Sequence, residues 1–222
     1  MKIFILTLFP EMLAPILKTS ILGRAQKKGL VDFQLINIRD FGLGARRIVD
    51  ARPYGGGAGM ILKADVLAAA LKSIPKHKMS RVIVTSASGK VFNQQSAREY
   101  AKLSELIIVC GHYEGIDQRF IDKFCDEEVS IGDFVLTGGE LPALVITDAI
   151  TRLLPGVLQK TEATIDESFT AGLLEYPHYT RPEIFEDIPT PTVLLSGDHG
   201  MVKKWREEKS RQKTKKIRPD LS

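Results

Sequence analysis

The sequence predicts an α/β protein in which a mostly parallel sheet is flanked by helices. Strand and helix patterns alternate through the first 150 of the 222 residues, as expected when crossover helices connect parallel strands. Two glycine-bearing turns, at residues 111–115 and 132–139, each follow a β-branched stretch. Because open α/β sheets bind ligands at the carboxyl ends of their strands, these turns are the first candidates for a binding site.

The individual elements follow from hydrophobic periodicity and from the residues that end each run. Strands are expected over residues 2–8, 31–38, 81–85, 106–110 and 128–131. Helices are expected over residues 10–18, 20–28, 64–73, 93–102 and 140–154. Gly29 ends the second of these helices, Asn93 caps the fourth, and Pro155-Gly156 ends the fifth.

The periodic pattern stops beyond the last of these helices. Residues 158–170 are polar and lack a core pattern, so a flexible linker is expected there. Residues 171–222 are rich in proline and charge, with one expected helix over residues 200–213 around Trp205. The sequence therefore predicts a first domain over residues 1–157 and a second one, small and mainly helical, after the linker.

Basic residues are concentrated near the carboxyl end. Residues 203–218 contain nine Lys and Arg against two Glu, a net charge of +7, which leaves −3 for the rest of a chain whose total is +4. A neutral-to-acidic body with a basic tail indicates a polyanionic partner. A solvated helix face is the alternative interpretation of such a run.

Composition excludes several classes of protein. The chain is 44% apolar and 26% charged, as soluble globular proteins are. Residues 1–10 are apolar, but Pro10 and Glu11 interrupt them and no cleavage site follows, so a buried strand is predicted rather than a signal peptide. No stretch reaches the roughly 20 apolar residues of a membrane span, so no membrane partner is expected. Cys110 and Cys125 indicate neither a disulfide framework nor a zinc site, and a cytoplasmic location is predicted.

A glycine-rich loop at residues 52–60 has the spacing of neither the dinucleotide fingerprint nor the phosphate loop. We expect it to contact a ligand or partner, with a plain surface turn as the alternative. The four histidines have no metal-ligand spacing, so no metal site is predicted. They are His77, His112, His178 and His199.

Five longer segments resemble one known family. They are RPYGGG (52–57), CGHYEGID (110–117), SIGDFVLTGGELPA (130–143), PHYTRP (177–182) and VLLSGDH (193–199). Together and in this order they are similar to bacterial tRNA (guanine-N1)-methyltransferases, and the similarity runs from residue 9 to beyond Trp205. The resemblance implies methylation of N1 of the guanosine immediately 3′ of the anticodon in tRNA, with S-adenosylmethionine as methyl donor.

The same resemblance implies a fold and a set of binding residues. Members of this family belong to the SPOUT class, in which the carboxyl-terminal part of the sheet domain forms a trefoil knot, a rare exception among folds. Three knot loops, residues 85–89, 111–115 and 130–139, would hold the donor. The implied donor-binding residues are Thr85, Ser86, Ala87, Gly89, Gly111, Tyr113, Glu114, Gly115, Ser130, Ile131, Gly132, Asp133, Phe134, Val135, Leu136, Gly138, Gly139 and Pro142. Family members are homodimers in which the partner completes each active site, and the small domain would bind tRNA.

The chemistry explains which catalytic residues the resemblance implies. Guanine N1 carries a proton, so methyl transfer needs a base for that proton and a cation for the charge that develops on O6. Arg152 matches the arginine of the family. The family's carboxylate stands directly before the Ser168-Phe169 pair, which places Glu167 where relatives have aspartate. Asp166, one residue earlier, remains the alternative base.

Two further positions bear on the site. Ala87 stands where relatives often carry proline, which is expected to soften the first donor-binding loop without removing its backbone contacts. Glu114 matches a residue associated with Mg²⁺ dependence in the family, so activity is expected to involve Mg²⁺ without a fixed protein metal site.

Three functions are compatible with these patterns. The first is the tRNA methylation described above, and the second is methylation of a different RNA, such as ribosomal RNA, by a related knotted enzyme. The third is RNA binding without catalysis. The presence of both Arg152 and a linker carboxylate argues against the third, because binding alone needs neither.

Overall fold

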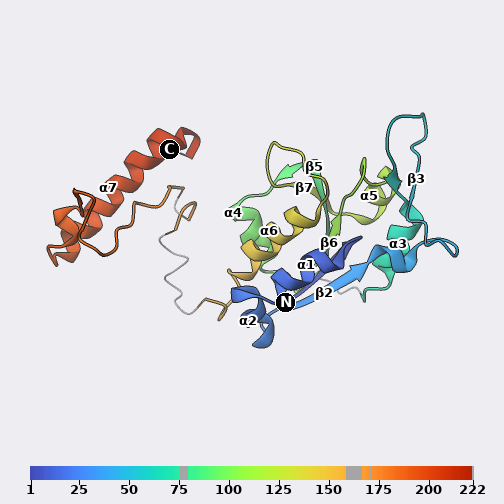
Figure 1. Cartoon of the computed structure of the whole chain (residues 1–222), viewed down its shortest axis with the longest axis horizontal. Coiled ribbons are helices and arrows are strands. Elements are labelled where there is room, and N and C mark those ends of the chain that lie inside the picture. Colours follow the sequence, from blue (N-terminus) through green and yellow to red (C-terminus); the bar gives the residue numbers. More distant parts are fainter. Residues whose placement is uncertain (76–79, 159–166, 171, 222) are drawn as a thin grey trace. The chain divides into compact units, whose positions relative to one another are not determined.

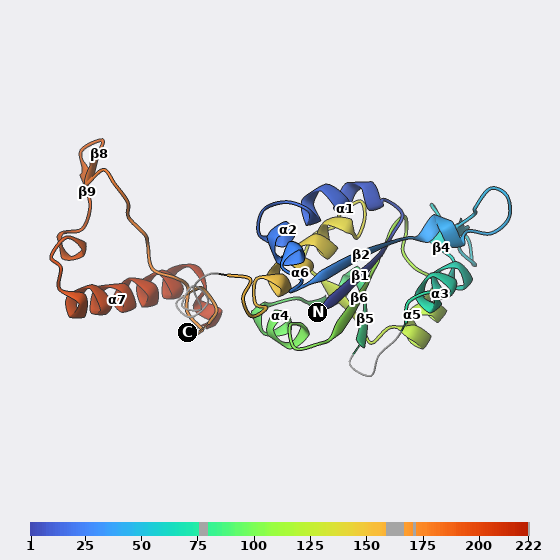
Figure 2. The same cartoon turned by 90° about the horizontal axis from the view of Figure 1, so that it is seen from below.

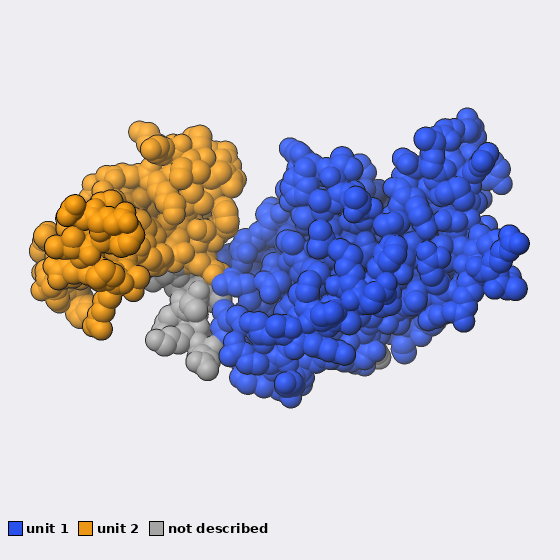
Figure 3. Space-filling model, viewed as in Figure 1, with its two compact units in different colours: residues 1–159 blue, residues 160–222 orange. Residues whose placement is uncertain are grey.

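The computed structural model describes residues 1–75, 80–158, 167–170 and 172–221. The chain divides into two compact units, residues 1–159 and residues 160–222 (Figure 3). Most of the predicted linker, residues 159–166, lies outside the described residues, as does His77.

The first unit is built on a five-stranded sheet whose neighbouring strands are all parallel (Figure 1). Its strands are β1 (Lys2–Thr7), β2 (Asp32–Asn37), β5 (Ser80–Val91), β6 (Glu105–Cys110) and β7 (Glu127–Ser130). Their order is β2-β1-β6-β5-β7, so β6 lies at the centre and every one of its residues is buried. The mostly parallel α/β sheet predicted from the sequence is confirmed.

Helices cover both faces of this sheet (Figure 2). One face carries α1 (Pro10–Leu17), α2 (Ser20–Lys27), α4 (Gln94–Tyr100) and α6 (Glu140–Thr151), and the other carries α3 (Ala64–Lys72) and α5 (Gln118–Phe124). Side chains of each strand alternate between the two apolar clusters, as Ile5 and Leu6 of β1 do. Because both faces are covered, the strands are nearly continuous apolar runs, which is why the sequence predicts them so directly.

Local signals explain where several helices begin and end. Gly29 follows α2 with a φ of +70°, a conformation that glycine adopts without steric cost. The Asn93 side chain accepts a hydrogen bond from the Ser96 backbone N at 2.9 Å and caps α4. Both features agree with the helix ends expected from the sequence.

Two elements of the first unit differ most from expectation, and α6 also ends at Thr151 and not at residue 154. Helix α5 is absent from the sequence prediction, because its seven residues bury only Phe120 and are too short to show a helical period. Strand β5 extends to Val91 instead of ending at Thr85, and its register with β7 shifts between Thr85 and Lys90. This irregularity moves residues 86–89 out of the regular ladder and next to the turns that follow β6 and β7.

Smaller elements flank the glycine-rich loop. A 3-10 helix covers Ile38–Phe41, and the antiparallel pair β3 (Asp50–Ala51) and β4 (Ile61–Leu62) closes residues 52–60 into a loop. Four glycines in this loop have positive φ, which explains its composition. The loop therefore joins two strands and is not a strand-to-helix phosphate loop, in agreement with its sequence.

The second unit contains one long helix and several short elements. They are β8 (Ile184–Phe185), β9 (Ile188–Pro189), 3-10 helices at Thr192–Leu194 and Pro219–Leu221, and α7 (His199–Ile217). The Asp198 side chain caps α7 by accepting hydrogen bonds from the backbone N of Gly200 and Met201. The helix is longer at both ends than the predicted range of residues 200–213. Buried Thr214 accepts a hydrogen bond from Leu174 N at 2.8 Å and ties the preceding segment to the helix.

The longest of the described helices, α7, has 19 residues. Within the described ranges, none of them combines the length and the apolar composition needed to cross a bilayer.

Candidate active site

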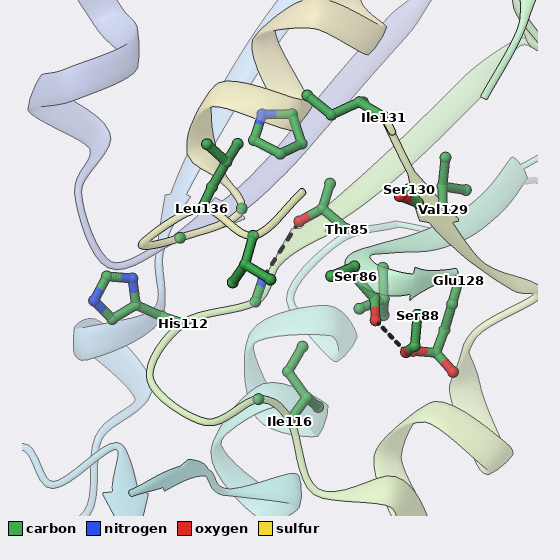
Figure 4. A pocket seen from close by; sticks show the side chains of 18 of the residues that line it. Thr85, Ser86, Ser88, His112, Ile116, Glu128, Val129, Ser130, Ile131 and Leu136 are labelled. Atoms are coloured by element: carbon green, nitrogen blue, oxygen red, sulfur yellow. Dashed lines mark hydrogen bonds between the residues drawn. The ribbon is translucent and has the colours of Figure 1, made fainter. Parts of the chain in front are cut away.

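Three loops meet at the carboxyl edge of the sheet and enclose a cavity of about 470 Å³ (Figure 4). One is the irregular part of β5, residues 86–89, and the other two follow β6 and β7. These three strands are neighbours or next neighbours in the sheet. A volume of this size lies within the usual range of small-molecule sites, about 300–1,000 Å³. The cavity is therefore where the topology of an open α/β sheet places a ligand.

Most of the residues assigned to donor binding from the sequence line this cavity. They are Thr85, Ser86, Ala87, Gly111, Tyr113, Glu114, Gly115, Ser130, Ile131, Gly132, Val135, Leu136, Gly138, Gly139 and Pro142. Gly89, Asp133 and Phe134 are not part of the lining. Gly89 packs against the backbone of Glu128 and Val129, and the half-exposed Phe134 ring turns back over Gly132.

Nine further residues line the cavity. They are Val84, Ser88, His112, Ile116, Gln118, Ile121, Glu128, Val129 and Thr137. Ser88, His112 and Thr137 lie in the three loops expected to hold the donor, although they were not themselves assigned to it. Gln118 and Ile121 belong to α5, which is too short to show a helical period. Figure 4 shows the Ser86 and Ser88 hydroxyls bonded to each other at 2.8 Å, with Glu128 beside them.

Close backbone packing explains the glycines of the cavity wall. Gly139 N donates a hydrogen bond to Gly111 O at 2.7 Å, which joins the loop after β7 to the loop after β6. A Cβ on Gly139 would lie 2.7 Å from Gly111 N and 2.9 Å from Cys110 Cα, closer than real side chains come. Thr85 Oγ1 accepts from Gly111 N at 3.3 Å, so β5 joins the same cluster where its register shifts (Figure 4). The three segments are thus held together by backbone hydrogen bonds and by the Thr85 hydroxyl.

The segment after Gly111 is anchored to the glycine-rich loop. Glu114 N donates to Met60 O, and Leu62 N donates to Gly115 O, both at 3.0 Å. Tyr113 has a φ of +59°. Burial is the main cause that raises the pKa of its hydroxyl, and a hydrogen bond to Asp50 is the second. The loop at residues 52–60 is therefore connected to the cavity wall, although it does not line the cavity itself.

The charge of the cavity lining is one-sided. Glu114 and Glu128 line the cavity, and the described lining contains no Lys or Arg. Carboxylates in the lining repel a phosphate-bearing ligand and attract a ligand with net positive charge. The lining thus favours a cationic, phosphate-free ligand.

Two of the residues assigned to catalysis, Arg152 and Glu167, are not among the lining residues. Arg152 follows α6, where its backbone N donates to Asp148 O at 3.1 Å, and belongs to the first unit. Glu167 belongs to the second unit, where its carbonyl accepts from Thr170 N at 3.3 Å. Asp166 lies outside the described residues.

Within residues 1–75, 80–158, 167–170 and 172–221, no group of three or more His, Cys, Asp or Glu has an arrangement that could hold a metal ion. In the cavity lining, Glu114 and Glu128 are the two carboxylates among the described residues.

Comparison with known proteins gives a match along the entire chain. The family model for "tRNA (Guanine-1)-methyltransferase TrmD" matches residues 1–222. A tRNA (guanine-N(1)-)-methyltransferase of Desulfitobacterium hafniense (strain Y51) is 51% identical over 222 residues, which cover 100% of this chain and 84% of the relative. Proteins with the same name from Alkaliphilus metalliredigens (strain QYMF) and Clostridium beijerinckii (strain ATCC 51743 / NCIMB 8052) are 52% and 51% identical, over 100% of this chain and 91% and 92% of theirs. The chain therefore belongs to the tRNA (guanine-1)-methyltransferase TrmD family.

Proposed function

We propose that this chain is an enzyme that transfers a methyl group from S-adenosylmethionine to N1 of the guanosine immediately 3′ of the anticodon in tRNA. The observation that carries this proposal is the family match over residues 1–222. Relatives with about half of their residues identical, aligned over this whole chain, are named tRNA (guanine-N(1)-)-methyltransferase. With tRNA as the substrate, the proposed location is the cytoplasm.

The chemistry of the cavity supports S-adenosylmethionine as its ligand. This donor carries a sulfonium, an ammonium and a carboxylate, so its net charge is +1, and it has no phosphate. Glu114 and Glu128 supply negative charge in the lining, and the described lining has no Lys or Arg to repel the sulfonium. Glycines at the strand ends leave backbone amides and carbonyls accessible to the adenosine and methionine parts.

The catalytic proposal assigns one role to each of two groups. The bound donor supplies an electrophilic methyl group, which bonds to guanine N1 as its bond to sulfur breaks. Glu167, with Asp166 as the alternative, accepts the proton that leaves N1. The Arg152 guanidinium stabilises the negative charge that develops on O6.

A trefoil-knotted arrangement of residues 85–139 is part of the same proposal. Two observations support it: the loop after β7 returns to hydrogen-bond Gly111, and α6 then packs on the sheet through Ala143, Ile146 and Ile150. Proteolytic cleavage within the loop after β7 should abolish donor binding without unfolding the sheet. Calorimetric titration measures the binding, and circular dichroism measures the fold.

We also propose that Mg²⁺ takes part in activity through Glu114, water and the substrates. A single carboxylate completed by waters and substrate oxygens is a common way to bind this ion. Removal of Mg²⁺ with a chelator should lower methyl transfer while the affinity for S-adenosylhomocysteine stays the same.

An exposed apolar face on α1 and α6 supports a homodimer whose active sites are shared between subunits. Met12, Ile16, Leu141 and Val145 are between 44% and 49% exposed, and α1 contacts α6. Next to them lies a hollow of about 370 Å³ lined by Ile16, Leu22 and Asp148 among others. Contiguous apolar surface of this kind marks protein interfaces, and a second copy of the chain is the proposed occupant.

The Val145→Glu variant should convert the dimer to a monomer of 24.6 kDa. Because Val145 is half exposed, the variant should stay folded. In the dimer interface the new carboxylate would be buried without a partner, which opposes association. Sedimentation or light scattering measures the mass. Leu43→Glu, with 44% exposure on the loop before β3, is the matched control and should remain dimeric. A dimeric Val145→Glu protein would contradict this interface.

The basic residues of α7 support tRNA binding by the second unit. Most of the nine Lys and Arg between 203 and 218 are exposed. Lys213 Nζ, however, donates to Glu175 O at 3.1 Å, so its replacement would also remove a contact within the unit. Lys204, Lys215 and Lys216 are exposed and suit a charge test better.

Replacement of Lys204, Lys215 and Lys216 by glutamine should weaken tRNA binding and reduce its salt dependence. Each lost phosphate contact should lower the slope of log affinity against log salt by about 0.7 to 0.9. Replacement of Lys27, Lys28 and Lys72 in the first unit removes the same charge from other exposed positions and should leave the slope unchanged. Equal slopes for both triple variants would mean that the basic residues of α7 face solvent and do not contact tRNA phosphates.

The function itself is tested by labelled methyl transfer to tRNA transcripts. The transcripts should differ only at the guanosine 3′ of the anticodon and at its 5′ neighbour. Transfer should require that guanosine and yield 1-methylguanosine on digestion. Methylation that persists after the guanosine is replaced, or that occurs only on ribosomal RNA, would overturn the proposal.

A further inference from the structure

A buried carboxylate lies directly behind the cavity wall. Glu140 is the first residue of α6 and is 3% exposed. Its Oε1 accepts a hydrogen bond from Thr7 Oγ1 at 2.8 Å, and Thr7 Oγ1 accepts from Phe9 N at 2.9 Å. The amino terminus of α6 also favours a negative charge at this position. Burial, and after it the charge of Glu140, raise the pKa of the Cys110 thiol, so the end of β6 also senses this charge.

The second oxygen of this carboxylate faces His112. Glu140 Oε2 lies 4.0 Å from His112 Nδ1, beyond the 2.7–3.2 Å typical of a hydrogen bond. Nδ1 is buried and has no hydrogen-bond partner among the described residues. A buried polar atom without a partner is costly, and a carboxylate oxygen can accept more than one hydrogen bond. The Nδ1–Oε2 distance exceeds the upper limit of a hydrogen bond by less than about 1 Å. A small shift of either side chain would therefore let Nδ1 donate to Oε2.

Gly138 leaves room for these two side chains to meet. A Cβ on Gly138 would press against Glu140 Oε2 and lie 2.7 Å from His112 Nδ1. His112 also pairs with Gly138 through a backbone bridge, and its ring packs on Phe9 with centroids 5.1 Å apart. Figure 4 places His112 at the rim of the cavity, beside the loop that carries Leu136.

We propose that Glu140 is a positioning residue that accepts a hydrogen bond from His112 Nδ1 and thereby holds the cavity wall in its donor-binding geometry. This inference rests on the proposed use of the cavity for S-adenosylmethionine. The loops after β6 and β7 contribute backbone amides to this wall. Contacts that fix the backbone of these loops therefore also fix the orientation of the amides. The contact between His112 and Glu140 joins these two loops at the point where Gly139 also bonds Gly111. Donor binding closes the 4.0 Å gap, and His112 donates whether its ring is the neutral Nδ1–H tautomer or the imidazolium.

A double-mutant cycle on the full chain tests the contact without turnover. Calorimetry with S-adenosylhomocysteine should show a loss of about tenfold in affinity for Glu140→Gln, because an uncharged amide makes a weaker hydrogen bond. His112→Phe keeps the ring packing on Phe9 but removes Nδ1, and should show a similar loss. The double variant should bind no more weakly than the weaker single variant, because both changes remove one contact.

Two controls separate positioning from stability. Glu105 is also 3% exposed but lies at the opposite end of β6 from Gly111, so Glu105→Gln should keep normal affinity even if its melting temperature falls. In methyl-transfer assays Glu140→Gln should raise KM for S-adenosylmethionine and leave kcat nearly unchanged, which a merely destabilised protein would not do.

The outcomes distinguish this inference from the proposed function. If the unmodified chain does not bind S-adenosylhomocysteine, the proposed function fails with it. If the unmodified chain binds but the single variants bind equally well, or if their losses add in the double variant, only the inference fails. Should Glu140→Gln not fold, ¹⁵N spectra of the His112 ring in the unmodified chain decide. A protonated, hydrogen-bonded Nδ1 in the complex supports the contact, and an unprotonated Nδ1 overturns it.

Discussion

Replacement of Glu167 by glutamine is expected to lower the rate of methyl transfer by about 10²-fold or more, the scale for loss of a general base. The affinities for S-adenosylhomocysteine and tRNA should be preserved, because glutamine has the same size and forms hydrogen bonds at the same place. Single-turnover measurements with labelled S-adenosylmethionine report the chemical step directly. The acid limb of the pH–rate profile should disappear in this variant if Glu167 is the group whose protonation causes it.

Asp166→Asn is the decisive comparison, because the two acids are adjacent in the chain. Only Glu167 belongs to the described residues, so the choice between them comes from its place before Ser168-Phe169. Glu183→Gln is a matched control, the same substitution at an exposed carboxylate of the second unit, and should keep the normal rate. A near-normal rate in Glu167→Gln together with a collapse in Asp166→Asn would assign the base to Asp166.

The second large effect is expected for Gly111→Val, which should abolish detectable binding of S-adenosylhomocysteine. A Cβ at this position would lie 2.9 Å from Thr85 O, at the rim of the cavity, and the two methyl groups would occupy additional volume there. Overpacking of this kind costs typically about 1–3 kcal/mol of stability, which a sheet covered on both faces should tolerate. Calorimetric titration measures binding, and circular dichroism verifies the fold.

Gly42→Val controls for the overpacking itself. A Cβ on Gly42 would lie 2.7 Å from Arg47 Cα, so this variant is also crowded by backbone, but Gly42 does not line the cavity. It should lose stability and retain normal affinity for S-adenosylhomocysteine. Unchanged affinity in a folded Gly111→Val protein would remove the cavity from consideration as the donor site.

The sheet and most helices could be predicted from the sequence because their signals are local. β1 and β6 are short apolar runs buried on both faces, and Asn93 and Gly29 mark helix ends through hydrogen bonds and φ angles within a few residues. α5 escaped prediction for the same reason, since seven residues with one buried side chain carry no measurable period.

The candidate site could be predicted only in outline. The glycine-bearing turns after strands indicate where a ligand binds, because glycine allows close backbone approach. Within the run after β7, however, Val135 and Leu136 line the cavity whereas Phe134 turns back over Gly132. An irregular loop has no period, so its sequence does not reveal which side chains face inward.

By itself the sequence determined the alternation of strands and helices, the basic carboxyl end and the family motifs, all of which are properties of contiguous residues. Only the tertiary structure decided which strand ends meet. Thr7 and Glu140 are 133 positions apart in the chain and form a buried hydrogen bond, and His112 of a third segment lies 4.0 Å from the same carboxylate. Contacts of this kind depend on strand order and on the packing of both sheet faces, which bring distant segments together and which no local pattern encodes.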